Sequence, residues 1–399
     1  MATKMEGPLN GIRVLDLSRI LAGPFCTMNL GDMGAEIIKI EQPGKGDDTR
    51  SWGPPFAGSE AAYFLGINRN KKSVTLDLKS GQGIEILKKL LKESDVLIEN
   101  FKFGTLDKFG ITDDWRKKEA PKLIHCQITG YGGRGPRGKR PGYDFLLQAE
   151  SGLMSITGEE NGDPMKVGVA LVDICTGMNA TIAILGALNS RNSSGEGQKV
   201  ETSLYTTSIS MLVNVAANHL VSGKPARRFG NGHPNIVPYR TFEASDGSIA
   251  IAVGNDTQFE KFSACLEKEE WSKDSRFIKN ADRVINRDAI DSEIQKVIER
   301  KTVKEWLGQL LDSNIPASAV NSVESALSDE QTLANDMVVE IDHSQAGRLK
   351  MLGVPYRFSN TPAQINKAPP LLGEDNQNIL NSLGYDDEMI NDMRSKKII

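Results

Sequence analysis

The sequence is poor in the residues that disulfide frameworks and zinc sites need. It contains four cysteines and four histidines in 399 residues. The cysteines form no CxxC pair, which indicates reduced thiols and not disulfides. No two histidines fall within one helical turn, so a zinc site would need ligands from distant segments, and we expect no metal. These positions are Cys26, Cys126, Cys175, Cys265, His125, His219, His233 and His343.

A strong net charge and a long apolar run are also lacking. Lys and Arg number 48 against 52 Asp and Glu, which gives a net charge of −4. That balance argues against a nucleic-acid partner. The longest clean apolar run, 182–188, is far shorter than the ~20 residues that cross a bilayer, so we expect no membrane partner. Residues 1–10 lack the features of a signal peptide, which predicts a soluble cytoplasmic protein.

Three common nucleotide and hydrolase motifs are missing. No GxGxxG follows a predicted strand, and residues 31–34 (GDMG) match that pattern only in part. The sequence has neither a GxxxxGK[ST] loop nor a GxSxG elbow. Dinucleotide binding, nucleotide hydrolysis and Ser-His-Asp catalysis therefore have no support from motifs.

The first half of the chain alternates short β-rich runs with helical patterns. Charged residues make up 25% and hydrophobic residues 39%, ordinary values for a folded chain that is long enough for two or three domains. The alternation predicts a doubly wound α/β sheet with right-handed crossovers. Expected strands are 12–17, 35–40, 73–78, 96–98, 123–129 and 199–204, and expected helices are 25–33, 84–91, 175–188 and 205–217.

The second half indicates a smaller α+β part followed by a return to the sheet. The stretch 230–234 is glycine-rich and predicts a mobile loop. Two β-rich runs joined by Ser-Asp-Gly predict a hairpin over 239–253, and 257–312 is charged and helical with Trp271 and Trp306 as anchors. Further strands are expected at 337–341 and 349–358, and a helical tail at 379–393.

Two segments contain residues that are able to do chemistry. The loop 134–144 carries four cations, which either contact phosphates or form a solvated surface. In 167–177, Asp173 interrupts an apolar strand just before a helix. That carboxylate is either an ordinary helix N-cap or an ionised nucleophile held by backbone N–H groups.

The order of several motifs resembles the class III CoA-transferase family, which includes formyl-CoA transferase, the carnitine CoA-transferases and α-methylacyl-CoA racemase. The resemblance covers nearly the whole chain. It implies an α/β fold with a large Rossmann-like domain from 1–222 and 326–399, a small α+β domain from 223–325, and an interlocked homodimer. The motifs are LDLSRILAGP at 15–24, GAEIIKIE at 34–41, GDDTRSW at 46–52, NRNKKS at 68–73, ENF at 99–101, ITGYG at 128–132, GYD at 142–144, Asp173 and PLLG at 370–373.

The resemblance makes Asp173 the catalytic nucleophile and acyl-CoA a substrate, with no permanently bound cofactor. An aspartyl anhydride and an aspartyl-CoA thioester would carry the transfer. Leu21 stands where formyl-CoA transferases have glutamine, and Gln42 and Lys108 replace arginines. The implied CoA contacts are Leu21, Ala22, Gln42, Leu76, Lys79, Asn100, Phe101, Lys102, Lys108, Arg140 and Tyr143.

The resemblance is nearest to succinyl-CoA:glutarate CoA-transferases, which act on dicarboxylates. The distal carboxylate of such a substrate needs a cationic partner, for which Arg50, Arg19 and His233 are candidates. Arg50 alternatively forms a local ion pair with Asp47 or Asp48. The implied residues of the substrate side and of an active-site lid are Arg19, Arg50, Trp52, Asp144, Gly230, Gly232 and His233.

Two other functions remain open. The racemases have a histidine where this chain has Tyr143, and tyrosine is a poor proton-transfer group near neutral pH, which favours a transferase. A non-catalytic CoA-binding subunit is the second alternative.

Overall fold

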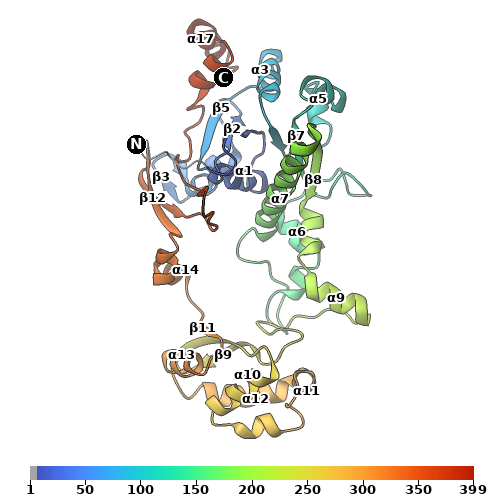
Figure 1. Ribbon diagram of the computed structural model, residues 1–399, viewed down its shortest axis with the longest axis vertical. Helices are drawn as coiled ribbons and strands as arrows, with labels where there is room; N and C mark the ends of the chain where they lie inside the picture. The colour runs from blue at the N-terminus through green and yellow to red at the C-terminus, as the bar shows by residue number, and fades with distance from the viewer. Residues whose placement is uncertain (1–6) are drawn as a thin grey trace. The chain divides into compact units, whose positions relative to one another are not determined.

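The computed structural model describes residues 7–399 (Figure 1). Two compact units are formed, the first from residues up to Ser151, Gly168–Met211 and Glu330–Ile399, the second from Gly152–Val167 and Leu212–Asp329. The sequence did not anticipate that 152–167 belongs with the second unit. Its backbone is held there by Arg228, whose guanidinium donates to the carbonyls of Ser155, Glu159 and Gly162.

A six-stranded parallel sheet forms the centre of the first unit, as the sequence predicts. The strand order is β5-β2-β1-β6-β7-β8, and every neighbouring pair is parallel. The chain extends the sheet in one direction from β1 and then in the other from β6, so the strand order reverses between these two strands. The bounds are β1 Arg13–Asp16, β2 Glu36–Glu41, β5 Lys71–Thr75, β6 Val96–Glu99, β7 Ile124–Thr129 and β8 Lys199–Ser203.

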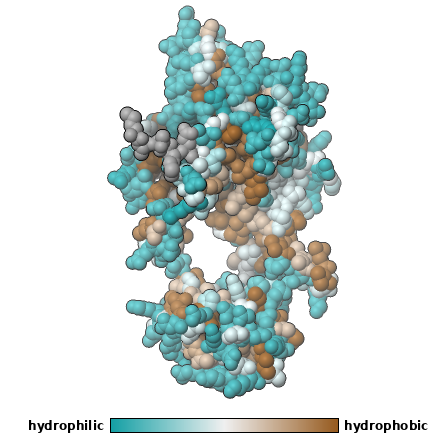
Figure 2. All heavy atoms as spheres, viewed as in Figure 1, coloured by the Kyte–Doolittle hydropathy of each residue, from teal (hydrophilic) through white to brown (hydrophobic). Residues whose placement is uncertain are grey.

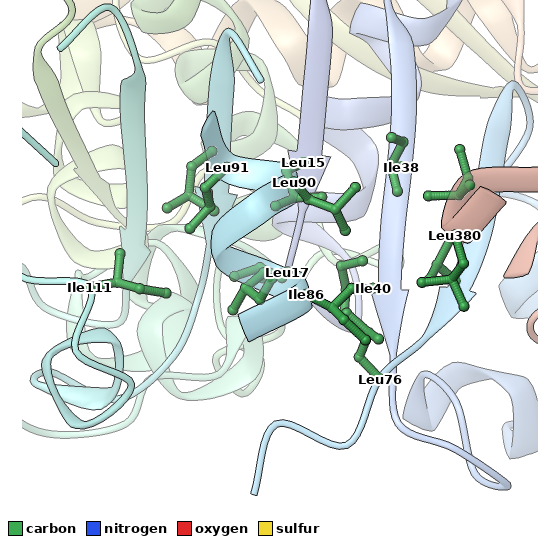
Figure 3. Close-up of a cluster of buried hydrophobic side chains, with 14 of the residues drawn as sticks. Leu15, Leu17, Ile38, Ile40, Leu76, Ile86, Leu90, Leu91, Ile111 and Leu380 are labelled. Atoms are coloured by element: carbon green, nitrogen blue, oxygen red, sulfur yellow. The ribbon is translucent and has the colours of Figure 1, made fainter. Parts of the chain in front are cut away.

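One face of this sheet is covered by helices from both ends of the chain. Helix α3, Gly81–Lys92, begins at Ser80, whose side chain accepts the Gly83 N–H, and its apolar face packs on Leu15 and Ile38. Leu380 of α16, Asn376–Ser382, belongs to the same cluster (Figure 3). Met393 of α17, Asp387–Ser395, completes it. The predicted tail is therefore two helices. Smaller helices here are α4 Thr105–Lys108 and α5 Asp113–Glu119.

On the other face, helix α1, Ala22–Asp32, packs against helix α7, Leu171–Ser194. A side chain at Gly177 of α7 would lie 2.6 Å from the Ala22 carbonyl oxygen, so glycine permits this close approach. Within residues 7–399, α7 alone is long and apolar enough to cross a membrane by length and composition, but its buried face packs on α1, β7 and β8. Core helices of soluble proteins share that property.

The predicted strand before α7 is wrong. Residues 167–170 form no strand, and the helix begins at Leu171, so Asp173 lies in the first helical turn. The alternation of valine and small residues in this segment imitates a strand. Packing against α1 stabilises the helical conformation from Leu171 onward instead.

The C-terminal segment returns to the edge strand β5. The Ser73 N–H donates to Asp375 Oδ2, at 2.9 Å, and the Asn70 N–H donates to the Lys367 carbonyl oxygen, at 2.9 Å. Arg69 joins Asp32 to the carbonyl of Leu352. The other elements of this unit are β3 Phe56–Ala57, β4 Glu60–Ala61, α2 Ala62–Leu65, α6 Asp144–Glu150, α8 Leu204–Ser210, α15 Glu330–Ala334, β12 Val338–His343 and β13 Gly347–Leu352.

The second unit is a small antiparallel sheet packed on helices. The predicted hairpin is confirmed as β9, Tyr239–Ala244, and β10, Gly247–Ala252, to which β11, Ala317–Ala319, adds. Trp271 and Trp306 are buried in its core, as expected. The predicted helix 205–217 breaks at Met211 into α8 and α9. The helices of this unit are α9 Val213–Ser222, α10 Asp256–Cys265, α11 Asn280–Ile285, α12 Arg287–Ile298, α13 Val303–Asp312 and α14 Val323–Ser328.

Candidate active site

A cavity of about 340 Å³ lies at the carboxyl ends of β1, β6 and β7. Open α/β sheets bind their ligands at this edge, where the strand order reverses and the following loops diverge. Asp173 is in its wall, together with Leu21 and Ala22. The lining consists of 19–22, 100–103, Thr105, 128–130, 139–143, Asp173 and Leu204.

A second cavity of about 230 Å³ shares two wall residues with the first. Arg19 and Phe101 line both, so the two cavities are neighbours. Gln42, Leu76 and Lys79, which the resemblance assigns to CoA, line the second. An extended ligand with a reactive end and a nucleotide end fits two neighbouring cavities better than one.

Asp144 holds the helix turn that carries Asp173. Helix α7 begins after Ala170, whose methyl side chain cannot accept a hydrogen bond and so cannot cap the helix. Asp144 Oδ2 accepts the N–H of Val172 at 2.8 Å and that of Asp173 at 3.3 Å. Asp173 is therefore not the N-cap, and Asp144, from the start of α6, supplies the cap from outside the helix.

The pKa of Asp173 is raised to about 7, first by burial and second by the negative charge of Asp144. Burial removes the water that would stabilise the carboxylate, and a like charge adds repulsion. Near neutral pH this carboxyl is therefore divided between its two protonation states. Its ionised form is a better nucleophile than an ordinary aspartate because it is more basic.

The predicted CoA contacts fall into three groups. Leu21, Ala22, Asn100, Phe101, Lys102, Arg140 and Tyr143 line the Asp173 cavity, and Gln42, Leu76 and Lys79 line the neighbouring one. Lys108, at the end of α4, lines neither cavity. Nothing in the local structure distinguishes Lys108 from a solvated surface lysine.

Arg50 is not available for a substrate carboxylate, contrary to one sequence expectation. Its guanidinium binds Glu41 at 2.7 and 2.8 Å and Glu60 at 3.1 Å, and it lies 3.7 Å from the centre of the Phe64 ring. The alternative of an ion pair with Asp47 or Asp48 is also wrong. Sequence proximity suggested those partners, whereas the parallel sheet places Glu41 at the end of β2 against Arg50.

Arg19 is half-exposed and pairs with Asp48 at 3.0 Å. Because this pair is open to water, it exchanges easily for another carboxylate. Arg19 also lines the Asp173 cavity. Of the cations expected for a distal carboxylate, it is therefore the one that lines the same cavity as Asp173.

Tyr63, which the sequence did not single out, lines neither cavity but is influenced by the acidic pair. Its pKa is raised to about 12, first by burial and then by the charges of Asp173 and Asp144. Its ring packs edge-on against Trp52, with the ring centres 5.2 Å apart. Tyr63 follows no recognisable motif, and only the fold brings helix α2 near the acidic pair.

The expected lid residues belong to the second unit. Gly230 has a φ of +57°, which suits glycine, and the His233 N–H donates to the Tyr239 carbonyl oxygen at 3.0 Å. The Gly232 N–H donates to the carbonyl of Phe229. Their role as a lid stays a prediction. In the part of the chain that the structure describes, no group of three or more metal-ligating side chains is found.

Comparison with known proteins shows the family of the chain. Residues 9–376 match the family described as CoA-transferase family III. The chain belongs to this family. It is 40% identical to the human succinyl-CoA:glutarate CoA-transferase, over 98% of this chain and 90% of that protein. It is also 40% identical to the succinate–glutarate CoA-transferase of Agrobacterium fabrum, over 94% of this chain and 96% of that protein.

A crystal structure shows the same fold. A CAIB/BAIF family protein from Brucella suis is 42% identical, has a TM-score of 0.83, and is matched over 95% of this chain and all of that one. The family resemblance read from the motifs is thus confirmed, and the protein is a CoA-transferase.

Proposed function

We propose that this CoA-transferase moves CoA from succinyl-CoA to a dicarboxylate acceptor such as glutarate, with Asp173 as its nucleophile. The observation that carries the proposal is the position of Asp173, partly buried and with raised pKa, in the wall of the cavity at the reversal of strand order. The names of the human and Agrobacterium relatives support the choice of acids.

The reaction begins when an oxygen of the Asp173 carboxylate attacks the thioester carbonyl of the donor. The C–S bond breaks, which gives a mixed anhydride and CoA thiolate. The thiolate then attacks the Asp173 carbonyl, releases the donor acid and leaves an aspartyl-CoA thioester. Because each step exchanges one activated acyl group for another, no ATP is needed.

The acceptor completes the cycle by the same chemistry in reverse order. Its carboxylate attacks the aspartyl-CoA thioester, which forms a new anhydride and frees the thiolate. Attack of the thiolate on the acyl carbonyl of the acceptor forms the new acyl-CoA and restores the Asp173 carboxylate. The N–H groups of Ala22 and Gly23, at the uncapped start of α1, stabilise the oxyanions, since Pro24 has no N–H and that of Phe25 bonds to the Leu21 carbonyl.

Arg19 receives the distal carboxylate in this proposal. The Asp48 carboxylate holds its guanidinium until a substrate carboxylate replaces it. A dicarboxylate thus places one carboxyl at Asp173 and the other at Arg19, both on the wall of one cavity. Acids with a single carboxyl lack the second contact, which explains a preference for dicarboxylates.

Chemical trapping tests the proposal. The enzyme is incubated with succinyl-CoA, treated with hydroxylamine, and the peptide containing Asp173 is analysed by mass spectrometry. We expect an Asp173 hydroxamate, and loss of transfer to glutarate by at least about 1000-fold in Asp173→Asn. Asp114→Asn, an exposed change on α5, is the matched control and keeps full activity.

Two results would contradict the proposal. An unmodified Asp173 with every acyl-CoA donor would support the non-catalytic subunit. Deuterium exchange at the carbon next to the thioester, without exchange of acids, would support the racemase.

A further inference from the structure

The loop between β1 and α1 contains a strained residue in the wall of the active-site cavity. Ile20 has a φ of +73°. A β-branched residue rarely adopts this left-handed conformation, which persists only where the surroundings enforce it. The next two residues, Leu21 and Ala22, lie in the cavity wall with Asp173. The conformation of Ile20 therefore determines where helix α1 begins relative to the nucleophile.

Asn100 holds one side of this loop with both ends of its amide. The Arg19 N–H donates to Asn100 Oδ1 at 3.0 Å, and Asn100 Nδ2 donates to the Arg19 carbonyl oxygen at 2.8 Å. Backbone pairing between β1 and β6 ends just before, where the Leu17 N–H donates to the Ile98 carbonyl at 2.9 Å. The Asn100 side chain thus continues the hydrogen bonding between β1 and β6 where the segments that follow these two strands separate around the cavity.

A buried ion pair holds the other side. The Ile20 N–H faces both oxygens of Asp47, at 3.3 Å each. Lys39 Nζ donates to Asp47 Oδ2 at 2.8 Å and to the Ser18 carbonyl oxygen at 2.9 Å. The side chains of Lys39 and Asp47 are fully buried, and the lysine charge holds the pKa of Asp47 at about 2 against the effect of burial.

We propose that Asn100 and Asp47 are positioning residues that keep the Ile20 loop in its strained conformation and so place the start of α1 against Asp173. This inference rests on the proposed role of Asp173. It differs from the sequence expectation for Asn100, because an amide engaged at both ends by one backbone residue acts through that backbone and not as a ligand of CoA.

Steady-state kinetics and CoA binding distinguish the two roles. We expect Asn100→Ala to lower kcat for transfer by about 10- to 100-fold, since a small misplacement of reacting groups has an effect of this size. The Kd of free CoA, measured by calorimetry, changes less than twofold. Asn381→Ala, an exposed change on α16, is the control for asparagine replacement. A raised Kd with unchanged kcat would overturn the proposal.

A second variant tests the strain directly. Glycine adopts a φ of +73° without strain, so the loss of kcat caused by Asn100→Ala should be several-fold smaller in an Ile20→Gly background than in the wild type. Equal losses in both backgrounds would overturn the role of strain. Failure to trap Asp173 in the wild type overturns the proposed function as well, whereas trapping combined with a normal kcat in Asn100→Ala overturns this inference alone.

Discussion

At the scale of single residues, Asp173 and Asp144 form a pair of neighbouring carboxyl groups that have different roles. Asp144 caps the helix turn with one oxygen, and its charge raises the pKa of Asp173. A nucleophile must be ionised to attack, so the wild-type kcat/KM should rise with pH through about 7, the raised pKa of Asp173.

Asp144→Asn should shift this acidic limb to lower pH, by about 0.5–1 unit, because the like charge is removed while an oxygen remains to cap α7. The measurement is the pH dependence of kcat/KM with succinyl-CoA. A shift to higher pH would show that Asp144 stabilises the Asp173 carboxylate, contrary to the electrostatics described above.

The raised pKa of Asp173 also predicts a gain of stability when the residue is replaced. Between pH 4 and pH 7 the folded chain binds this proton more tightly than the unfolded chain, so the free energy of unfolding falls as pH rises. Asp173→Asn has no carboxyl group to ionise, so its free energy of unfolding does not fall in this way. It should therefore be more stable than the wild type at pH 8, by a few kcal/mol at about 1.4 kcal/mol per pKa unit.

Urea unfolding at pH 8 and pH 4 checks this prediction. The difference between Asp173→Asn and the wild type should nearly vanish at pH 4, where the wild-type carboxyl is protonated. An equal difference at both values would assign the change in stability to packing instead.

The proposed nucleophile could be predicted from the sequence, whereas its surroundings could not. Asp173 follows an apolar run and matches a family motif, so it stood out. The acidic cap from Asp144 and the electrostatic effect of Asp173 on Tyr63 join segments that are far apart in the sequence. Arg50 binds Glu41 and Glu60, nine and ten residues away, at spacings that match no helical or strand period. No local pattern encodes such partners.

At the scale of elements, the contact between α1 and α7 fixes the distance between the start of α1 and Asp173. Gly177 lies one helical turn after Asp173 and touches Ala22. Alanine favours helices over glycine by about 1 kcal/mol. At this position, however, its Cβ would lie 2.6 Å from the backbone oxygen of Ala22, so the backbone would have to shift.

Gly177→Ala should therefore destabilise the protein by about 1–3 kcal/mol and lower activity, because α1 must shift. Gly186→Ala, in the same helix with nothing within 4 Å, is the matched control. It should be neutral or stabilising by about 0.5–1 kcal/mol. Thermal unfolding and transfer assays measure both, and equal behaviour of the two variants would contradict the close approach.

Element types followed from sequence where the pattern was regular. Leu87, Leu90 and Leu91, at helical spacing, correctly predicted the buried face of α3, and the β-rich run at 12–17 correctly predicted β1. The start of α7 did not, because 167–177 alternates like a strand, and its helical state depends on the packing of Gly177 against Ala22.

At the scale of the whole molecule, exposed apolar side chains gather on the helices around Asp173. Phe145 of α6 and Met178 and Ile182 of α7 are exposed, Ile182 to 66%. In the second unit, Leu220 and Val221 of α9 are exposed as well, and the brown surface in Figure 2 includes this helix. Such surfaces are typical of subunit interfaces.

We propose that the chain is a homodimer that covers these side chains. Ile182→Arg should then lower the dimer fraction measured by sedimentation velocity at micromolar concentration. Met389→Arg, at an exposed apolar position on α17, is the control and should leave assembly unchanged. A wild type that sediments as a monomer would contradict the proposal.

The outer strand β5 has a consequence for the synthesis of the protein. On its free side, Ser73 bonds to Asp375 and the Thr75 N–H donates to Asn376, while Asn70, just before β5, bonds to Lys367. While a ribosome is still making the second unit, those partners do not yet exist, and a bare sheet edge invites pairing with other chains. Nascent chains that stall late in translation should therefore be the aggregation-prone species, and a chaperone that shields strand edges would act at that stage.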